Sequence, residues 1–290
     1  MTVTQRFSRF LSNITLTWSE KEDGEAKHRG VCNCLNQHYY GLDHETQNGT
    51  LVGSWGKGTR VRPPRDVDLL FRLPDSVYWR FQQRSGNRQS ALLQEVKQVL
   101  QRRYPRTDIR GDGPVVKVNF GSYNVELVPG FWFTSLQYGI PITASGGHYK
   151  AFDPYAETQV VESADKSSSG NGRNLIRMAK RWQDYCNVPM KSFWIELLAA
   201  EFIVRWPQRN QSVEYYDWMS RDFFGYIFGR TGGVVTVPGT GETLPLGYEW
   251  KSRAQSAWTN AHRACNFETK TPRLAGCLWQ EIYGEDIPIE

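Results

Sequence analysis

Acidic residues inside apolar strands are the feature that most constrains how this sequence can fold. In the predicted strand 66–71, Asp66 and Asp68 are the only residues that are not apolar. Side chains two residues apart on a strand leave the same face, with Cα atoms about 6.6 Å apart, so both carboxylates can reach one cation. Burying such a pair beside apolar residues costs free energy unless positive charge neutralises it. The pattern therefore predicts a cation site.

A third acid occurs in a later apolar strand. Glu126 lies within residues 124–128, which follow the predicted strand 115–120 after a short turn, and this spacing predicts a β-hairpin. If the strand of Glu126 pairs beside residues 66–71, the three acids form one site. Carboxylate ligands of this kind favour magnesium or manganese over zinc. Two such ions are the usual apparatus for in-line displacement at phosphorus.

A glycine-rich turn upstream of these acids predicts a phosphate-binding element. Residues 50–52 form a predicted strand that leads into a flexible turn at 53–59, which begins with Gly53 and Ser54. Glycine allows the backbone to approach a phosphate, and a serine hydroxyl can hold its oxygens. Either feature by itself favours the simpler explanation, a plain turn in the one case and solvated edge residues in the other. Their combination favours a site for metal and nucleotide.

At this point the residues resemble the polymerase-β-type nucleotidyltransferases, and most of all the bacterial cyclic-oligonucleotide synthases (CD-NTases), which are relatives of cyclic GMP-AMP synthase and oligoadenylate synthase. The stretches that carry the resemblance are residues 53–59, 62–68, 125–129 and 175–182. The resemblance implies that the acids bind two Mg²⁺ ions, with Mn²⁺ as an alternative, and that the turn holds a nucleotide triphosphate. The residues concerned are Asp66, Asp68 and Glu126 for metal and catalysis, and Gly53 and Ser54 for the triphosphate. The third acid is Glu where relatives often have Asp, which keeps the charge and lengthens the side chain.

The pattern along the chain predicts an α+β fold with two lobes. We expect a mixed sheet with helices, the nucleotidyltransferase core, over residues 1–160, including N-terminal helices near 4–20 and 25–39 and a helix over 90–104. Residues 161–290 are expected to form a helical lobe, with the active site in the cleft between the lobes. The polar stretch 167–172 is predicted to be flexible, followed by helices near 173–186, 190–205, 212–228 and 250–268.

The predicted helix 173–186 carries basic residues on one face. They are Arg173, Arg177, Lys180 and Arg181. A solvated charged face is the simplest explanation, but the resemblance implies that Lys180 contacts the triphosphate. It implies the same for Ser192, at the start of the next helix, where a hydroxyl suits phosphate binding. Phe193 either stacks on a base or packs in the core.

Composition excludes several other classes of protein. Lys and Arg number 35 against 30 Asp and Glu, a net charge of +5, which is too small to indicate a nucleic-acid ligand. The sequence has neither an apolar stretch of bilayer length nor a secretory signal pattern, so we expect no membrane partner. Five scattered cysteines suit a reducing compartment. We therefore expect a cytoplasmic protein.

The function implied by the resemblance is synthesis of a cyclic di- or trinucleotide second messenger from NTPs (ATP, GTP or others), with release of pyrophosphate. Its setting would be bacterial anti-phage (CBASS) signalling, with a downstream effector activated by the product and with regulatory protein partners. Two alternatives stay open: a template-independent nucleotidyltransferase acting on RNA or protein, and a catalytically silent nucleotide-binding regulator. The segment 247–265 departs from the Asp-Pro-x-x-Pro-x-Asn stretch of many relatives, so the sequence leaves base choice and product open.

Overall fold

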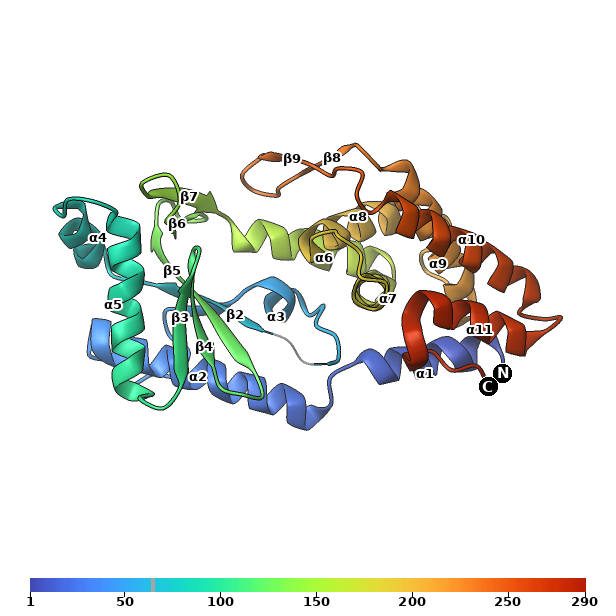
Figure 1. Ribbon diagram of the computed structural model, residues 1–290, viewed down its shortest axis with the longest axis horizontal. Coiled ribbons are helices and arrows are strands. Elements are labelled where there is room, and N and C mark those ends of the chain that lie inside the picture. The colour runs from blue at the N-terminus through green and yellow to red at the C-terminus, as the bar shows by residue number, and fades with distance from the viewer. Residues whose placement is uncertain (64–65) are drawn as a thin grey trace. The chain divides into compact units, whose positions relative to one another are not determined.

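The computed structural model describes residues 1–63 and 66–290, which divide into two compact units (Figure 1). The sheet unit contains residues 16–58 and the described residues up to 156. The helical unit contains residues 1–15, 59–63 and 157–290. Residues 64 and 65 of the motif at 62–68 lie outside the described residues. The sequence analysis placed residues 1–160 together, whereas these contacts group residues 1–15 and 59–63 with the helical unit.

A mixed seven-stranded sheet organises the sheet unit. Its strands are β1 (Gly49–Leu51), β2 (Val67–Arg72), β3 (Asp108–Asp112), β4 (Val115–Asn119), β5 (Asn124–Trp132), β6 (Tyr138–Ile142) and β7 (His148–Phe152). Along the main path the order is β1-β2-β5-β4-β3, and β6 pairs with both β5 and β7. Strands β2 and β5 are parallel and the other pairs are antiparallel. The predicted hairpin is confirmed by the antiparallel pairing of β4 with β5.

Four helices complete this unit: α2 (Trp18–Tyr40), α3 (Gly53–Lys57), α4 (Asp75–Gln82) and α5 (Arg88–Arg103). One face of the sheet packs against α2 and α5 in a single apolar core. Val67, Leu69 and Phe71 of β2 are fully buried in it. Because side chains alternate along a strand, the residues between them, including Asp68, face the other side of the sheet.

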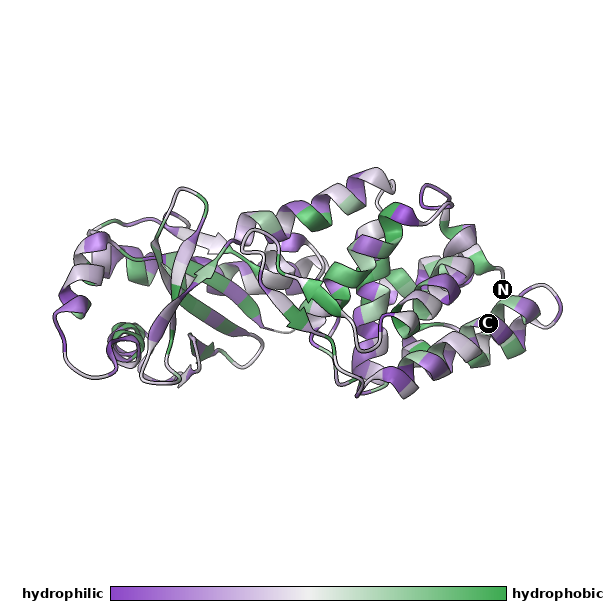
Figure 2. Cartoon of the chain, turned by 90° about the horizontal axis from the view of Figure 1, so that it is seen from above, coloured by the Kyte–Doolittle hydropathy of each residue, from purple (hydrophilic) through white to green (hydrophobic). Residues whose placement is uncertain are grey.

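The helical unit is built from α1 (Val3–Ile14), most of α6 (Pro154–Ser167), α7 (Asn171–Tyr185), α8 (Ser192–Arg205), α9 (Tyr216–Gly229), α10 (Lys251–Phe267) and α11 (Pro272–Tyr283). Short 3-10 helices lie at Val213–Tyr215 and Gly284–Asp286, and β8 (Val234–Thr236) pairs with β9 (Thr243–Pro245). Purple and green alternate along these helices in Figure 2, as expected for amphipathic helices around one core. The predicted helical second half is therefore confirmed. None of the helices in the described ranges combines the length and apolar character needed to cross a bilayer.

The predicted helix 4–20 is wrong in its second half. Helix α1 ends at Ile14, and α2 begins at Trp18 after the N-cap Thr17. Thr17 and Glu20 form a capping box, in which each side chain accepts a hydrogen bond from the other's backbone N–H. Trp18, expected on the buried face, is 78% exposed. The capping residues therefore outweigh the apolar periodicity at this point.

Helix α1 packs against the C-terminal end of the chain in the core of the helical unit. The Phe7 ring lies 5.2 Å from that of Trp279, and the Phe10 ring lies 4.6 Å from that of Tyr283. All four side chains are buried, as is Ile14 on the same face of α1. This packing is the physical reason why residues 1–15 belong with the helical unit.

A fully buried arginine ties the two chain ends together. The Arg6 guanidinium donates hydrogen bonds to the carbonyl oxygens of Pro272 (2.7 Å), Pro288 (2.7 Å) and Ile289 (3.0 Å). Its Nε lies 3.3 Å from Oε1 of Glu268, which is also buried. The net stability of such a pair is small, but removal of one partner leaves the other charge buried alone.

We predict that Arg6→Ala lowers the free energy of unfolding by about 3–5 kcal/mol, because Glu268 loses its ion-pair partner. Urea unfolding measures the change. Arg9→Ala, an exposed arginine on the same helix, is the control and should change stability by less than about 0.5 kcal/mol. Equal effects of the two substitutions would contradict the assigned contacts.

Candidate functional site

The pairing of β2 with β5 brings the predicted acids together. Asp68 and Glu126 are partners in the parallel register, and Asp66 immediately precedes β2. Each of the three lies at a position that alternates with the buried residues of its strand, so they share the face opposite α2 and α5. The condition set by the sequence analysis, that the strand of Glu126 lies beside residues 66–71, is therefore met.

A lysine that the sequence analysis did not select lies between two of these acids. Lys117 is the partner of Glu126 on the neighbouring strand β4. Its Nζ is 2.9 Å from Oε1 of Glu126 and 3.4 Å from the carboxylate of Asp66. Asn124 donates a hydrogen bond of 2.7 Å to Oδ1 of Asp66. A lone lysine in the apolar stretch 115–118 was the signal for it, by the same reasoning that selected Glu126.

The electrostatics of this cluster show an excess of negative charge. Burial, and after it the nearby charge of Asp66, raises the pKa of Glu126, although its hydrogen bond with Lys117 acts in the opposite direction. The same hydrogen bond to Glu126 raises the pKa of Lys117. The carboxylates therefore hold the lysine strongly in its charged form, and Glu126 ionises less readily than an exposed glutamate.

The glycine-serine turn lies directly beside Asp68. The backbone N–H of Val52 donates a hydrogen bond of 3.0 Å to the Asp68 carbonyl oxygen. Gly53 follows with φ +55°, and a Cβ atom at this position would lie 2.1 Å from Oδ2 of Asp68. Only glycine can therefore occupy this position without moving the carboxylate. Ser54 comes next and is half-buried.

The turn is helical where the sequence analysis expected a flexible loop. Residues Gly53–Lys57 form α3, which ends at Gly58 in the left-handed conformation. Trp55 anchors it: the side chain is buried, and its ring lies 5.8 Å from that of Tyr123 in an edge-to-face contact. Anchoring by Trp55 is a tertiary contact that the local glycine pattern does not reveal.

The donor type of the cluster fits magnesium or manganese, because carboxylate oxygens are the ligands that these ions prefer. Nevertheless, within residues 1–63 and 66–290 no three His, Cys, Asp or Glu side chains are already arranged to hold a metal ion. The Lys117 ammonium instead contacts two of the three acids. Asp66, Asp68 and Glu126 are thus close neighbours that are not preassembled as a ligand set.

Lys180, predicted to contact a triphosphate, is buried in the helical unit. Its side chain is 8% exposed, and Nζ lies 2.5 Å from Oε1 of Glu196 on α8 and 3.0 Å from Oγ1 of Thr59. Thr59 also donates a hydrogen bond of 2.6 Å to the same glutamate oxygen. These three residues hold segment 59–63 against α7 and α8. Thr59 and Glu196 had no signal in the sequence, because 137 residues separate them.

Ser192 and Phe193 open helix α8. The Ser192 hydroxyl donates a hydrogen bond of 2.8 Å to Oε1 of Gln183 on α7, and both Ser192 and Phe193 are half-buried. The structure therefore places Lys180 and Ser192 on adjacent helices. Base stacking by Phe193 stays a prediction.

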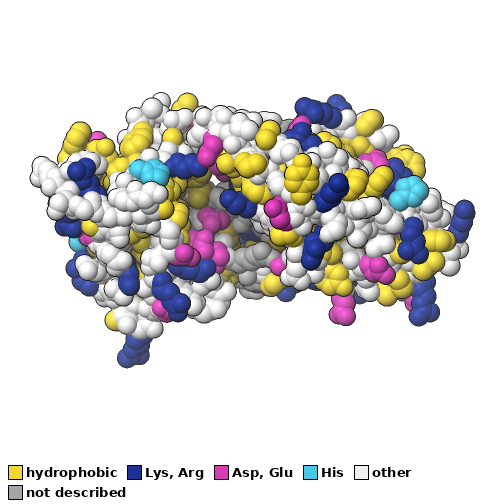
Figure 3. All heavy atoms as spheres, turned by 45° about the horizontal axis from the view of Figure 1, so that its top comes forward, with side chains coloured by type: hydrophobic (Ala, Val, Ile, Leu, Met, Phe, Trp, Pro, Cys, Tyr) yellow, Lys and Arg dark blue, Asp and Glu magenta, His cyan; other side chains and the backbone are white. Residues whose placement is uncertain are grey.

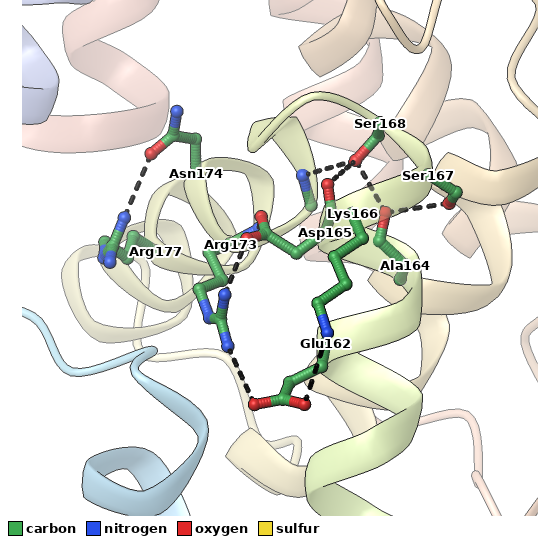
Figure 4. Close-up of polar contacts among 10 residues, drawn as sticks. Glu162, Ala164, Asp165, Lys166, Ser167, Ser168, Arg173, Asn174 and Arg177 are labelled. Atoms are coloured by element: carbon green, nitrogen blue, oxygen red, sulfur yellow. Dashed lines mark hydrogen bonds and ion pairs between the residues drawn. The ribbon is translucent and has the colours of Figure 1, made fainter.

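The other basic residues of α7 are paired with nearby polar groups (Figure 4). Arg173 lies 2.7 Å from Asp165 and 3.9 Å from Glu162, and Arg177 donates a hydrogen bond of 3.0 Å to Asn174. Arg181 is paired with Asp184 and Asp286. Lys and Arg are spread over the face drawn in Figure 3, with Asp and Glu among them. The predicted basic face is thus compensated by acids from α6, α7 and the C-terminal segment.

The polar stretch 167–172 contains a tight turn, residues 168–170, between α6 and α7. Ser168 is fully buried, and its hydroxyl donates to the Ala164 carbonyl oxygen (2.7 Å) and accepts from the Gly172 N–H (2.9 Å). Figure 4 shows these contacts. The expected flexible stretch is therefore a turn fixed by side-chain hydrogen bonds.

Comparison with families of known proteins gives one match. Residues 1–164 match the model described as a Second Messenger Oligonucleotide or Dinucleotide Synthetase domain. No curated protein sequence matches the chain.

Several solved structures share the fold over nearly the whole chain. Escherichia coli MS115-1 CdnC, in its complex with HORMA-deltaN, is 16% identical with a TM-score of 0.69, and 98% of each chain is covered. Vibrio cholerae DncV cyclic AMP-GMP synthase, in complex with the linear intermediate 5′ pppA(3′,5′)pG, is 12% identical with a TM-score of 0.71, covering 99% of this chain and 97% of that one. The Bradyrhizobium diazoefficiens CD-NTase CdnG, in complex with GTP, is 12% identical with a TM-score of 0.69, covering 97% and 95%. These likenesses confirm the expected α+β fold class.

We predict that Glu196→Gln lowers the free energy of unfolding by about 3 kcal/mol, because the Lys180 charge then stays buried without a carboxylate. Chemical denaturation without nucleotide measures the change. The control is Glu201→Gln on the same helix, whose partly exposed pairs with Arg205 and Arg230 should together contribute less than about 1 kcal/mol. A Glu196 variant as stable as the control would show that this pair contributes little to stability.

Proposed function

This chain belongs to the family of second messenger oligonucleotide or dinucleotide synthetases, and on that premise we propose that it is a nucleotidyltransferase that makes a cyclic di- or trinucleotide from NTPs. The single observation that carries the proposal is the convergence of Asp66, Asp68 and Glu126 on one face of the sheet, next to Gly53 and Ser54. Carboxylates that can hold divalent ions, beside a turn that can hold phosphate, suit the transfer of a nucleotidyl group.

In the proposed reaction, a ribose hydroxyl of one nucleotide attacks the α-phosphorus of an NTP. A phosphodiester bond forms, the bond between the α-phosphorus and the oxygen that bridges to the β-phosphate breaks, and pyrophosphate leaves. A second transfer of the same kind closes the ring. Two Mg²⁺ or Mn²⁺ ions, when bound, would lower the pKa of the attacking hydroxyl and neutralise the charge on the leaving group.

In this reaction the chain's own residues mainly position the substrates and neutralise their negative charge. Asp66, Asp68 and Glu126 would hold the ions, and the α-phosphorus would then lie beside the face that they share. Gly53 lets the backbone come close to the phosphates, and the Ser54 hydroxyl can donate to a phosphate oxygen. The solved complexes of DncV with a linear dinucleotide intermediate and of CdnG with GTP support this choice of substrate class.

Residues of the helical unit complete the proposed nucleotide contacts. We infer that Lys180 and Ser192 contact the triphosphate and that Phe193 stacks on a base. Lys180 would then exchange its contact with Glu196 for a phosphate oxygen, so substrate binding would also loosen the hold on Thr59. Binding of the triphosphate would in this way weaken the contacts that hold segment 59–63.

We propose a role in the cytoplasm in anti-phage (CBASS) signalling, where the product activates a separate effector. CdnC has been solved in complex with HORMA-deltaN, and this supports a regulatory protein partner for the present chain as well. Such a partner would raise the rate above the basal activity of the isolated chain.

One prediction of this proposal concerns the reaction itself. The purified chain, incubated with all four labelled NTPs and Mg²⁺ or Mn²⁺, should yield a phosphatase-resistant cyclic product identified by mass spectrometry. Asp68→Asn should lower the rate by roughly 10²–10³-fold, because charge neutralisation at the site is lost. Label transferred to RNA or protein in a lysate would favour the alternative transferase, and nucleotide binding with equal turnover in wild type and Asp68→Asn would contradict the assigned site.

Another prediction of this proposal concerns Gly53. Gly53→Ala should lower kcat by roughly 100-fold while the protein stays folded, because the new Cβ forces the Asp68 carboxylate to move by about an ångström. The matched control is Gly113→Ala, at φ +59° in the β3–β4 turn, where nothing lies within 4 Å of the added Cβ. Both variants carry similar backbone strain, so an equal loss of kcat in the two would exclude the contact with Asp68 as its cause.

A further inference from the structure

Lys117 lies at the border between the acid cluster and a small polar pocket. The pocket has a volume of about 150 Å³ and is lined by Asp108, Arg110, Lys117, Asn119 and Asn124. All of these residues come from the edge strand β3, its neighbour β4 and the start of β5. The lysine side chain is 31% exposed, so it is not locked in place by packing.

The pocket offers this lysine a second set of partners. In the register of β3 and β4, Arg110 is opposite Lys117 and Asp108 is opposite Asn119, so Asp108 is a diagonal neighbour of Lys117. Diagonal neighbours on one face lie about 7–8 Å apart, which a long side chain can span. The Asp108 carboxylate already accepts a charged group, because it pairs with Arg110 at 2.7 Å. Two asparagine side chains supply further oxygen acceptors.

The present position of Lys117 is one that a divalent ion would also need. Its Nζ is within 3.4 Å of both Asp66 and Glu126, and like charges cannot approach the same oxygens without strong repulsion. This accounts for the three acids being neighbours without forming a ready ligand set.

We propose that Lys117 is an internal counter-ion: its ammonium holds Asp66 and Glu126 in the metal-free protein and moves into the Asp108 pocket when divalent ions bind. Lys117 is thus a positioning residue that sets the affinity of the acids for metal. The inference rests on the proposed function, because it takes these acids to be the metal ligands. Its consequence is that the negative charge of the metal-free site is partly compensated, and that the site assembles only when the ion concentration is sufficient.

The test is equilibrium binding of Mn²⁺ to the full chain without nucleotide, measured from the electron paramagnetic resonance signal of the free ion. Lys117→Met should lower the Kd for Mn²⁺ about fivefold, the size of effect expected from a solvent-screened charge pair. Lys117→Gln should act in the same direction and serves if the Met variant does not fold. Arg106→Met, which removes one exposed positive charge before β3, is the control and should leave the Kd within about twofold.

A second pair of variants separates the counter-ion role from a structural one. Asp108→Asn should raise the Kd about twofold in the wild-type background, because the lysine loses a partner in the pocket. It should have no effect when combined with Lys117→Met, since the lysine that uses the pocket is then absent. A merely structural role of Lys117 does not produce these opposite signs.

The outcomes distinguish this proposal from the proposed function. If Asp68→Asn abolishes Mn²⁺ binding but the Lys117 variants bind as wild type or more weakly, the counter-ion proposal is overturned and the metal site stands. If Asp68→Asn leaves Mn²⁺ binding unchanged, the acids are not the metal ligands and both proposals fail. Tighter binding in Lys117→Met, with the Asp108 effect lost in the double variant, supports both.

Discussion

The parallel pairing of β2 with β5 is the constraint on which the candidate site depends. It sets Asp68 beside Glu126, while Val67, Leu69 and Phe71 are buried on the other face of the sheet. A slip of one residue would turn the acids toward the apolar core and the apolar residues toward solvent. The hydrophobic core therefore fixes the position of the charged site, and folding and function share one register.

Ion pairs compensate the main charged side chains in both units of the structure. Lys117 neutralises the acids of the sheet unit, Glu196 neutralises Lys180 in the helical unit, and Glu268 neutralises Arg6. Buried charges such as Arg6 and Lys180 are stable only while their partners stay in place. In the proposed enzyme, metal ions and a triphosphate are the partners that would replace Lys117 and Glu196. Substrate binding would then be an exchange of ion pairs within folded units.

The segment after α3 connects the glycine-serine turn to β2 and passes through the helical unit. Gly53 and Ser54 belong to the sheet unit, residues 59–63 belong to the helical unit, and β2 returns to the sheet unit. Thr59, fully buried against Lys180 and Glu196, holds this segment. The two sequence motifs of the site, the glycine-serine turn and the acidic strand, are therefore joined by residues whose position is set by helices more than 120 residues further along the chain.

The sequence by itself determined the fold class, the hairpin and the helical second half, and it predicted Asp66, Asp68, Glu126, Gly53 and Ser54 as site residues. These follow from short-range patterns, because strand alternation and turn chemistry act over a few residues. Only the tertiary structure decided that Lys117 contacts the acids, that Lys180 is paired with Glu196, and that α1 belongs with the helical unit. Those contacts join residues brought together by packing, and the energy of a charge depends on the neighbours that packing supplies.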